Sequence, residues 1–101
     1  MKKERVSLSK DQITEFCQKN HIKKFAFFGS VLRDDFRQDS DIDILVELDR
    51  RFKTGLIKMS KMEIELSEII GRKVDLRTPD DLSEYFRNKV LSEAEVIYEG
   101  R

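Results

Sequence analysis

Hydrophobic residues recur at helical spacing in three segments of the chain. In the first segment, Ile13, Phe16 and Cys17 lie at positions i, i+3 and i+4, which places their side chains on one face of a helix. In the second and longest segment, Gly71 follows the last apolar residue, as is typical of a helix end. The three predicted helices cover residues 9–20, 54–70 and about 80–94.

Shorter segments between the helices show the alternation that is typical of β-strands. In one of them, aliphatic residues at every second position share one face, whereas Asp41, Asp43, Leu45 and Glu47 share the other. Another segment is rich in phenylalanine and stops at Gly29, which indicates a strand followed by a turn. The predicted strands are Lys23–Phe28, Asp41–Leu48 and Lys73–Thr78.

The order of the predicted elements indicates the fold class. A short helix or turn is expected from Ser30 to Phe36, and Glu95–Glu99 is expected to add a short edge strand. The main order is α-β-α-β-α-β-α, which predicts an α/β domain with helices flanking a small mixed β-sheet. A chain of 101 residues has room for one hydrophobic core, so residues 1–101 are expected to form a single domain.

Charge and cysteine content argue against several classes of protein. The chain has twenty basic and twenty acidic residues, and this balance argues against a general nucleic-acid binder or an anionic-membrane binder. Its single cysteine, Cys17, allows neither an intrachain disulfide nor a zinc cluster of Cys and His. No apolar run approaches the roughly 20 residues that span a bilayer, and the first residues lack the apolar stretch of a secretory signal. A cytoplasmic setting is expected.

Two aspartates, Asp41 and Asp43, face the same side of a strand that is otherwise largely apolar. A rise of about 3.3 Å per residue puts their Cα atoms about 6–7 Å apart. Two carboxylates at this distance repel each other in a medium of low dielectric constant, and a divalent cation between them removes that cost. Their oxygen atoms suit Mg²⁺, which keeps several water ligands and also binds substrate phosphates.

Asp75 is the third candidate carboxylate. It lies between the core positions Val74 and Leu76, so its side chain faces away from the core. If the third strand pairs with the second, Asp75 completes a triad with the other two aspartates. Such a triad can hold two metal ions, or hold one and orient a nucleophile, and Asp75 is then a candidate general base for an attacking hydroxyl.

Gly29 and Ser30 follow the first predicted strand and form a candidate phosphate site. A glycine lets the backbone turn sharply and approach a ligand closely. Ser30 offers a hydroxyl and begins a short predicted helix whose first N–H groups are unpaired, which suits a phosphate. Arg33 lies one turn further on and can add charge-assisted hydrogen bonds to the same phosphates. A phosphate site that faces metal-binding carboxylates is the arrangement required for phosphoryl or nucleotidyl transfer.

Each of these features has a simpler structural explanation when it is taken alone. An Asp-x-Asp motif is common on surface loops, a Gly-Ser pair is a turn signal, and an aspartate in a short strand is usually solvated. The combination is more specific than its parts. It consists of a strand, Gly29-Ser30, ten intervening residues, a strand with Asp41 and Asp43, and a later strand with Asp75.

On these motifs, the sequence resembles the minimal nucleotidyltransferases (MNT) of the DNA-polymerase-β-like superfamily. The signature of that family is Gly-Ser, ten residues, and Asp-x-Asp. Here the signature is Gly29-Ser30, then VLRDDFRQDS, then Asp41-Ile42-Asp43. The likeness covers nearly the whole chain, from about Ser9 to Glu99, and both halves of the motif agree in spacing.

Four further positions agree with the family pattern, and one position departs from it. Arg33, Asp39 and Ser40 stand where the family commonly has Arg, Asp and Ser, and Asp75 stands at the place of the third acid. Asp34 stands where the family often has Gly. An acid that points into a phosphate site opposes nucleotide binding, whereas one that faces solvent is harmless.

The resemblance implies both a reaction and a set of residues. A hydroxyl would attack the α-phosphate of ATP in line, and pyrophosphate would leave. One or two Mg²⁺ ions would be held by Asp41, Asp43 and Asp75, the last of which could instead activate the hydroxyl. The nucleotide would be held by Gly29, Ser30, Arg33 and Ser40.

The resemblance also implies a protein partner. Small members of the family lack the extra domain that binds an acceptor in larger members, and they resemble the antitoxin of a toxin–antitoxin pair. The toxin is then a helical HEPN-domain ribonuclease in a hetero-oligomer, and AMP is transferred from ATP to one of its tyrosines. Binding to nucleic acid or to a membrane is not expected.

Two alternatives remain open at this point. The chain could neutralise its partner by occlusion alone, without catalysis, which Asp34 weakly favours. It could instead be the catalytic subunit of a small-molecule or RNA nucleotidyltransferase whose acceptor site lies on another chain.

Overall fold

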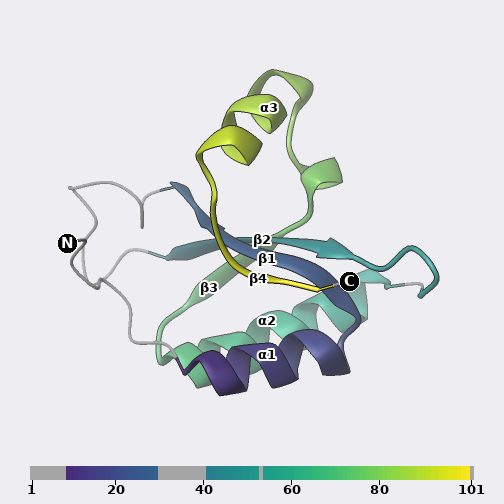
Figure 1. Ribbon diagram of the computed structural model, residues 1–101, viewed down its shortest axis with the longest axis vertical. Helices are drawn as coiled ribbons and strands as arrows, with labels where there is room; N and C mark the ends of the chain where they lie inside the picture. The colour runs from purple at the N-terminus through teal and green to yellow at the C-terminus, as the bar shows by residue number, and fades with distance from the viewer. Residues whose placement is uncertain (1–8, 30–40, 53, 101) are drawn as a thin grey trace.

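The computed structural model describes residues 9–29, 41–52 and 54–100. It contains a four-stranded sheet with two helices against one face and a third helix standing on the other (Figure 1). The elements in chain order are α1 (Lys10–Lys19), β1 (Ile22–Phe28), β2 (Ile42–Leu48), α2 (Leu56–Ile70), β3 (Val74–Arg77), the 3-10 helix η2 (Pro79–Asp81), α3 (Glu84–Glu93) and β4 (Glu95–Glu99).

The strands lie in the order β3-β2-β1-β4. β1 pairs antiparallel with both β2 and β4, whereas β2 and β3 run parallel. A parallel pair requires a crossover connection, which α2 supplies between β2 and β3. The predicted mixed sheet and the edge strand at Glu95–Glu99 are therefore confirmed. The second and third strands pair, which is the condition under which Asp75 was expected to join the other two aspartates.

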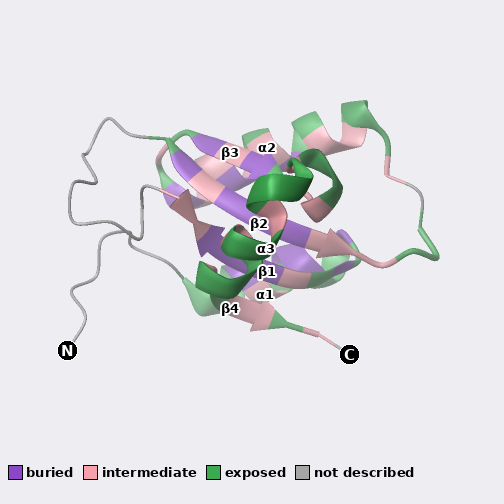
Figure 2. Ribbon diagram, turned by 90° about the horizontal axis from the view of Figure 1, so that it is seen from above, coloured by how far each residue is buried: buried purple, intermediate pink, exposed green. Residues whose placement is uncertain are grey.

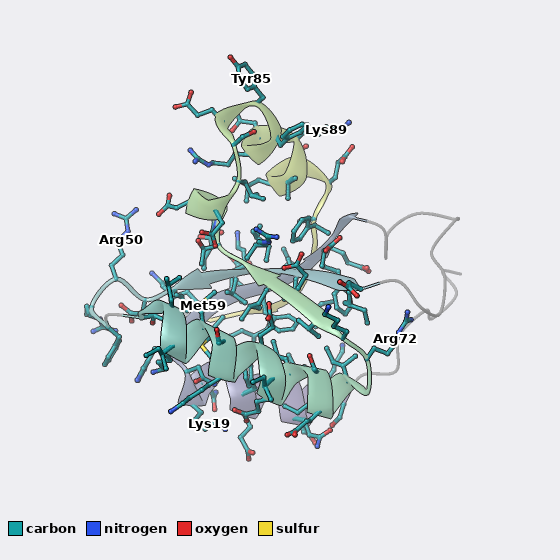
Figure 3. All side chains as sticks on the ribbon, turned by 180° about the vertical axis from the view of Figure 1, so that it is seen from behind. Lys19, Arg50, Met59, Arg72, Tyr85 and Lys89 are labelled. Atoms are coloured by element: carbon teal, nitrogen blue, oxygen red, sulfur yellow. The ribbon has the colours of Figure 1, made fainter. Side chains whose placement is uncertain are left out.

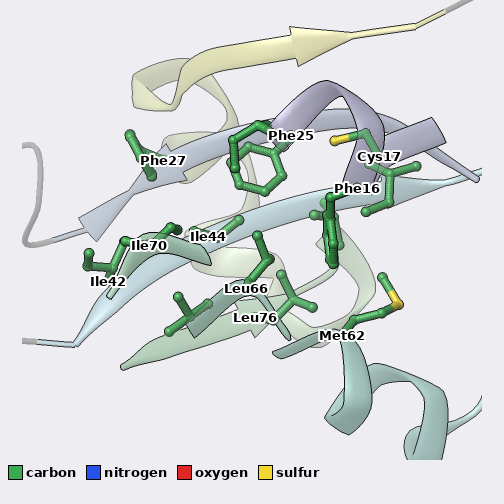
Figure 4. Close-up of a cluster of buried hydrophobic side chains, with 14 residues drawn as sticks. Phe16, Cys17, Phe25, Phe27, Ile42, Ile44, Met62, Leu66, Ile70 and Leu76 are labelled. Carbon is green, nitrogen blue, oxygen red and sulfur yellow. The ribbon is translucent and has the colours of Figure 1, made fainter. Parts of the chain in front are cut away.

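One face of the sheet carries the hydrophobic core, beneath α1 and α2. The alternating side chains Ile42, Ile44 and Val46 of β2 are fully buried there. Phe16 of α1 and Leu66 of α2 pack into the same cluster (Figure 4). The apolar faces that the sequence predicts for the first two helices and for the second strand are thus the faces that meet in the core.

The opposite face of the sheet is covered only in part. Leu45 and Ala26 are register partners on this face, and both are buried. α3 stands above them, and the structure describes all ten of its residues, none of which is buried. In Figure 2, α3 is largely green, the colour of exposed residues, while the strands beneath it carry most of the purple.

Side chains of α2 cover the outer edge of β3. The N–H of Val74 donates to Ser67 Oγ at 3.1 Å, and the N–H of Leu76 donates to Glu63 Oε2 at 2.8 Å. These bonds satisfy donors that would otherwise attract a further strand. The outer edge of β3 is therefore bonded to side chains of α2, and its inner edge pairs with β2.

The predicted helix at about 80–94 is divided in the structure. Leu82 and Ser83 have extended backbone conformations, so η2 ends before α3 begins. Arg87 joins the two pieces, because its Nε donates to the carbonyl of Pro79 at 2.9 Å and its guanidinium also donates to the carbonyl of Leu82 at 3.1 Å. The short helix or turn expected from Ser30 to Phe36 lies outside the described residues. Within the described ranges, no helix is long and apolar enough to cross a bilayer.

Candidate active site

The pairing of β2 and β3 brings two of the predicted acids together. Asp43 is the register partner of Asp75 in the parallel pair, between Ile42–Val74 on one side and Ile44–Leu76 on the other. Because the flanking pairs face the core, both aspartates face the opposite side of the sheet. Asp43 and Asp75 are both half-buried. The strand alternation therefore delivers two carboxylates to one place on the open face.

Asp41 stands just before β2 and is exposed. The start of the strand is fixed by a hydrogen bond from the N–H of Ile42 to the carbonyl of Lys73, at 2.9 Å. The ammonium of Lys73 lies 4.0 Å from the carboxylate of Asp41, and the two side chains are 81% and 48% exposed. An ion pair this long and this exposed contributes little stability.

Gly29 closes the site from the side of β1. Phe28 is the register partner of Asp43, so Gly29 lies directly beyond this pair. The glycine has a φ of 74°, and a Cβ built on it would overlap Oδ2 of Asp43 and lie 3.1 Å from its Cγ. Only glycine combines this backbone conformation with so close an approach. The segment after β1 therefore begins in contact with a candidate metal-binding carboxylate.

Asp75 is held by a neighbouring cation, Arg77. The guanidinium of Arg77 approaches both carboxylate oxygens, with Nε 3.0 Å from Oδ1 and a terminal nitrogen 3.3 Å from Oδ2. The hydrogen bonds and charge of Asp75 raise the pKa of Arg77 above its ordinary value, and the more distant charges of Asp81 and Asp43 act in the same direction. Arg77 is therefore paired with Asp75 and stays protonated beside it.

The donor groups of the site fit Mg²⁺ in kind, although they are not gathered around one point. Asp41, Asp43 and Asp75 could hold the metal, since Mg²⁺ takes one or two carboxylates together with waters and substrate phosphates. Among the described residues, no three side chains of His, Cys, Asp or Glu come close enough together to hold a metal ion. One of the carboxylates, that of Asp75, has both of its oxygens hydrogen-bonded to Arg77.

A cavity of about 560 Å³ opens beside Asp75, over the edge of β3. Its polar lining includes Arg77, Thr78 and Asp81, and α2 contributes Met59 to the apolar part. The carboxylate of Asp81 is hydrogen-bonded within the cavity wall, because its Oδ2 accepts from the N–H of Thr78 at 3.0 Å and from the hydroxyl of Thr78 at 3.2 Å. The cavity gives Asp75 and Arg77 a shared open space.

Several predicted site residues lie outside the described part of the chain. These are Ser30, Arg33 and Ser40, the proposed phosphate contacts, together with Asp34 and Asp39. Their roles remain predictions. Asp41, Asp43, Asp75 and Gly29 are described, and the structure places them at the same end of the sheet.

Arg77 is the site residue that sequence reasoning missed. The alternation of the third strand places Arg77 on the same face as Asp75, but it assigns no role to the arginine. The signal was the sequence Lys73-Val-Asp75-Leu-Arg77, in which a cation stands two residues away on each side of the acid. Residues two apart in a strand share a face, so an acid flanked in this way meets its counter-ion locally.

Comparison with known proteins shows the family to which the chain belongs. The model of the nucleotidyltransferase domain family matches residues 9–97. MJ0435 of Methanocaldococcus jannaschii is 32% identical over 85 residues, which cover 84% of this chain and 89% of that protein. Protein adenylyltransferase MntA of Thermococcus cleftensis is 31% identical over 84 residues, which cover 83% of this chain and 81% of that protein.

Solved structures share the fold. A toxin–antitoxin structure with AMP-PNP aligns with a TM-score of 0.73 and 20% identity, covering 93% of this chain and 76% of that one. A complex of a tri-AMPylated Shewanella oneidensis HEPN toxin with its MNT antitoxin aligns with a TM-score of 0.65 and 19% identity, covering 91% and 70%. The resemblance read from the Gly-Ser and Asp-x-Asp motifs is confirmed, and the chain belongs to the nucleotidyltransferase domain family.

Proposed function

We propose that this protein is a Mg²⁺-dependent protein adenylyltransferase, which transfers AMP from ATP to a tyrosine of a HEPN-domain toxin and thereby acts as its antitoxin. The observation that carries the proposal is the direct register of Asp43 with Asp75, on an open face, beside a glycine that touches Asp43. The name of the Thermococcus relative and the AMPylated toxin in the Shewanella complex support AMP as the transferred group and a HEPN protein as the acceptor.

The proposed reaction is a single in-line displacement. The acceptor oxygen forms a bond to the α-phosphorus of ATP, the bond from that phosphorus to the bridging oxygen breaks, and pyrophosphate leaves. In this proposal Asp75 takes the proton of the acceptor hydroxyl after its carboxylate is released from the hydrogen bond with Arg77. Bound Mg²⁺ would neutralise the phosphate charge that builds up during transfer.

The remaining residues have roles in binding the nucleotide. Asp41 and Asp43 hold the metal, with Asp75 as a further ligand when it is not acting as the base. Gly29 gives the phosphates close access to the backbone, and Ser30, Arg33 and Ser40 donate hydrogen bonds to them. We place the protein in the cytoplasm, where ATP is available as the substrate.

Occlusion without catalysis is the second candidate, and α3 is the observation that favours it. Tyr85 is 93% exposed and Phe86 63% exposed on a helix with no buried residue. Figure 3 shows Tyr85 at the far end of α3, pointing away from the sheet. A helix that leaves such side chains in water offers a surface to a protein partner whether or not the acids are active.

Transfer from α-labelled ATP in the presence of Mg²⁺ tests the proposal. The wild type would be compared with Asp41→Asn/Asp43→Asn and with Asp11→Asn, a control that removes an exposed carboxylate from α1 on the other side of the sheet. The co-purified HEPN partner is the acceptor. We expect label on the partner with the wild type and the control, and a loss of about 100-fold or more in the double variant.

The outcomes separate the candidate functions. Label on RNA instead of protein would change the acceptor class while keeping the enzyme. No label with any variant, while the double variant still binds and neutralises the partner, would overturn the catalytic proposal in favour of occlusion.

A further inference from the structure

The outward face of α2 carries apolar side chains that the core does not use. The buried residues of the helix, which form its inward face, are Met62, Leu66 and Ile70. Ile57 and Ile64 lie one heptad apart on the opposite side of the helix, and they are 76% and 62% exposed. Isoleucine is not a favoured residue at exposed helix positions, so helix propensity does not account for the pair. A helix with apolar residues on two opposite faces is typical of one that packs on both sides.

Two charged residues share this outward face with the isoleucines. Lys61 stands four residues after Ile57, and Glu68 stands four residues after Ile64, so the four side chains form one row, which we call the outer stripe. Lys61 and Glu68 are both exposed. Among the ion pairs that join described residues, none involves either of these two side chains. Both charges can therefore pair with a molecule that packs on this face.

The charges of the outer stripe oppose the dipole of their own helix. The amino end of a helix favours acidic residues, and the carboxyl end favours basic ones. Lys61 lies in the amino-terminal half of α2, whose first turn has no acid, and Glu68 lies in the last turn, which has no base. A second helix that runs antiparallel has the reversed dipole, so its carboxyl-terminal half would favour Lys61 and its amino-terminal half would favour Glu68.

We propose that the outer stripe is the contact of a symmetric homodimer, in which α2 packs antiparallel against α2 of a second copy of this chain. A two-fold axis that passes between residues 64 and 65 places Lys61 of each chain beside Glu68 of the other, because the two positions are equally far from the axis. The same axis brings the two Ile64 side chains together at the centre. The contact is self-complementary, as two-fold symmetry requires, and it forms two equivalent ion pairs.

The surface beside α2 has hollows that suit a second helix. One, of about 600 Å³, is lined by Asn20 at the end of α1 and by Ile57 and Lys61 of the stripe. Another, of about 340 Å³, is lined by Ile64 and Glu68. Ridges of side chains on one helix pack into grooves of this kind on another. Because α2 and α3 lie on opposite sides of the sheet (Figure 1), this dimer leaves the carboxylates of the open face accessible.

Charge reversal in the outer stripe tests the homodimer. Lys61→Glu and Glu68→Lys each place like charges across the contact at both ion pairs, so each should weaken dimerisation of the full chain by about 10-fold or more. Sedimentation velocity at several protein concentrations measures the change. Ile64→Gln should also weaken dimerisation, because it removes the apolar centre. The control Lys89→Glu makes the same charge change on α3, beyond the other face of the sheet, and should match the wild type (Figure 3).

A mixture of the two single variants separates a lost contact from a folding defect. The Lys61→Glu chain has two acids in the stripe and the Glu68→Lys chain has two bases, so a mixed dimer restores both ion pairs. We expect the mixture to dimerise with an affinity close to that of the wild type, at a concentration where each variant alone is monomeric. Both changes also agree with the dipole of α2, so neither variant should melt at a lower temperature than the wild-type monomer.

Three results would overturn the homodimer. One is a wild-type chain that stays monomeric up to about 1 mM, which leaves no significant affinity for a second copy. Another is a mixture that dimerises no better than its two components. The third is a monomeric wild type whose binding to the HEPN partner is weakened by Lys61→Glu, since the outer stripe would then dock that partner and not a second copy.

Discussion

The two faces of the sheet are built on opposite principles. The face beneath α1 and α2 collects large apolar side chains such as Phe16 and Leu66, which are excluded from water. The other face carries Asp43, Asp75 and Arg77, and above it stands α3, a helix without a buried residue. The same strands serve both faces, because the side chains alternate. Stability is concentrated on one side of the sheet, which leaves the other side free to keep charges that would be costly in a core.

The largest difference between the two faces is expected when one apolar side chain is shortened on each side of the sheet. Leu66→Ala removes a fully buried side chain and should lower the free energy of unfolding by about 2–5 kcal/mol. Phe86→Ala, at a position 63% exposed on α3, should change it by about 0.5 kcal/mol or less. Urea denaturation measures both changes. Equal losses would contradict the assignment of the core to one face.

The second prediction compares two glycines with similar backbone conformations. Gly29 has a φ of 74° and Gly71 a φ of 80°, but an added Cβ overlaps Asp43 only at Gly29 and meets open space at Gly71. Gly71→Ala should cost about 1 kcal/mol of backbone strain. Gly29→Ala should cost more, and it should also weaken Mn²⁺ binding because the methyl group displaces the carboxylate of Asp43.

Thermal unfolding and metal titration of the two glycine variants check this prediction. If Gly29→Ala and Gly71→Ala lose the same stability and both bind Mn²⁺ like the wild type, then the close approach of Gly29 to Asp43 is not a feature of the molecule.

The third prediction concerns the thiol on the buried side. Burial raises the pKa of Cys17 to about 12, from an ordinary value of 9.0. Between about pH 9 and 12 the Cys17 thiol therefore stays protonated in the folded protein but ionises in the unfolded chain. The contribution of the buried thiol to stability is fully present below about pH 9 and declines as the pH rises toward about 12. At pH 8 the native thiol should react with iodoacetamide far more slowly than the unfolded chain does. Rapid alkylation of the native protein would contradict this burial.

The smallest effect is expected at the turn after β2, away from the core. Hydrogen bonds from Arg51 lower the pKa of Asp49 to about 2, from an ordinary value of 3.8. Because this pKa is lowered, the ionised Asp49 contributes to the stability of the folded protein above about pH 4, and this contribution is lost as the pH falls toward 2. Because the side chain of Arg51 is 80% exposed, water screens the pair, and Asp49→Asn should remove only a small part of the acid sensitivity of the protein. Acid titration followed by circular dichroism measures it.

The sequence predicts which residues occupy each face of the sheet more fully than it predicts which charged groups pair on the open face. The period-two pattern around Asp43 and the acid between Val74 and Leu76 fixed which side each aspartate would face. The pairing of β2 with β3, which the sequence left as a condition, then made them neighbours. Helical spacing likewise placed Ile13, Phe16 and Cys17 in the core.

The pairing of Asp75 with Arg77 could not be predicted in the same way. Strand alternation predicts which side chains share a face, but it does not predict which charged group pairs with a given carboxylate. That choice depends on atomic distances, and here Arg77 lies within 3.0 Å of Asp75. The division between η2 and α3 was missed for a related reason, since the extended backbone at Leu82 and the hydrogen bonds of Arg87 are local contacts that periodicity does not encode.

The most direct test of the central claim is transfer of AMP by a protein with one altered carboxylate on the open face. Label from α-labelled ATP would be followed onto the HEPN partner with the wild type and with Asp43→Asn, after both have been shown to unfold at the same temperature. The account predicts that the wild type labels the partner and that Asp43→Asn does so about 100-fold more slowly or worse. Equal labelling by the two proteins would contradict it.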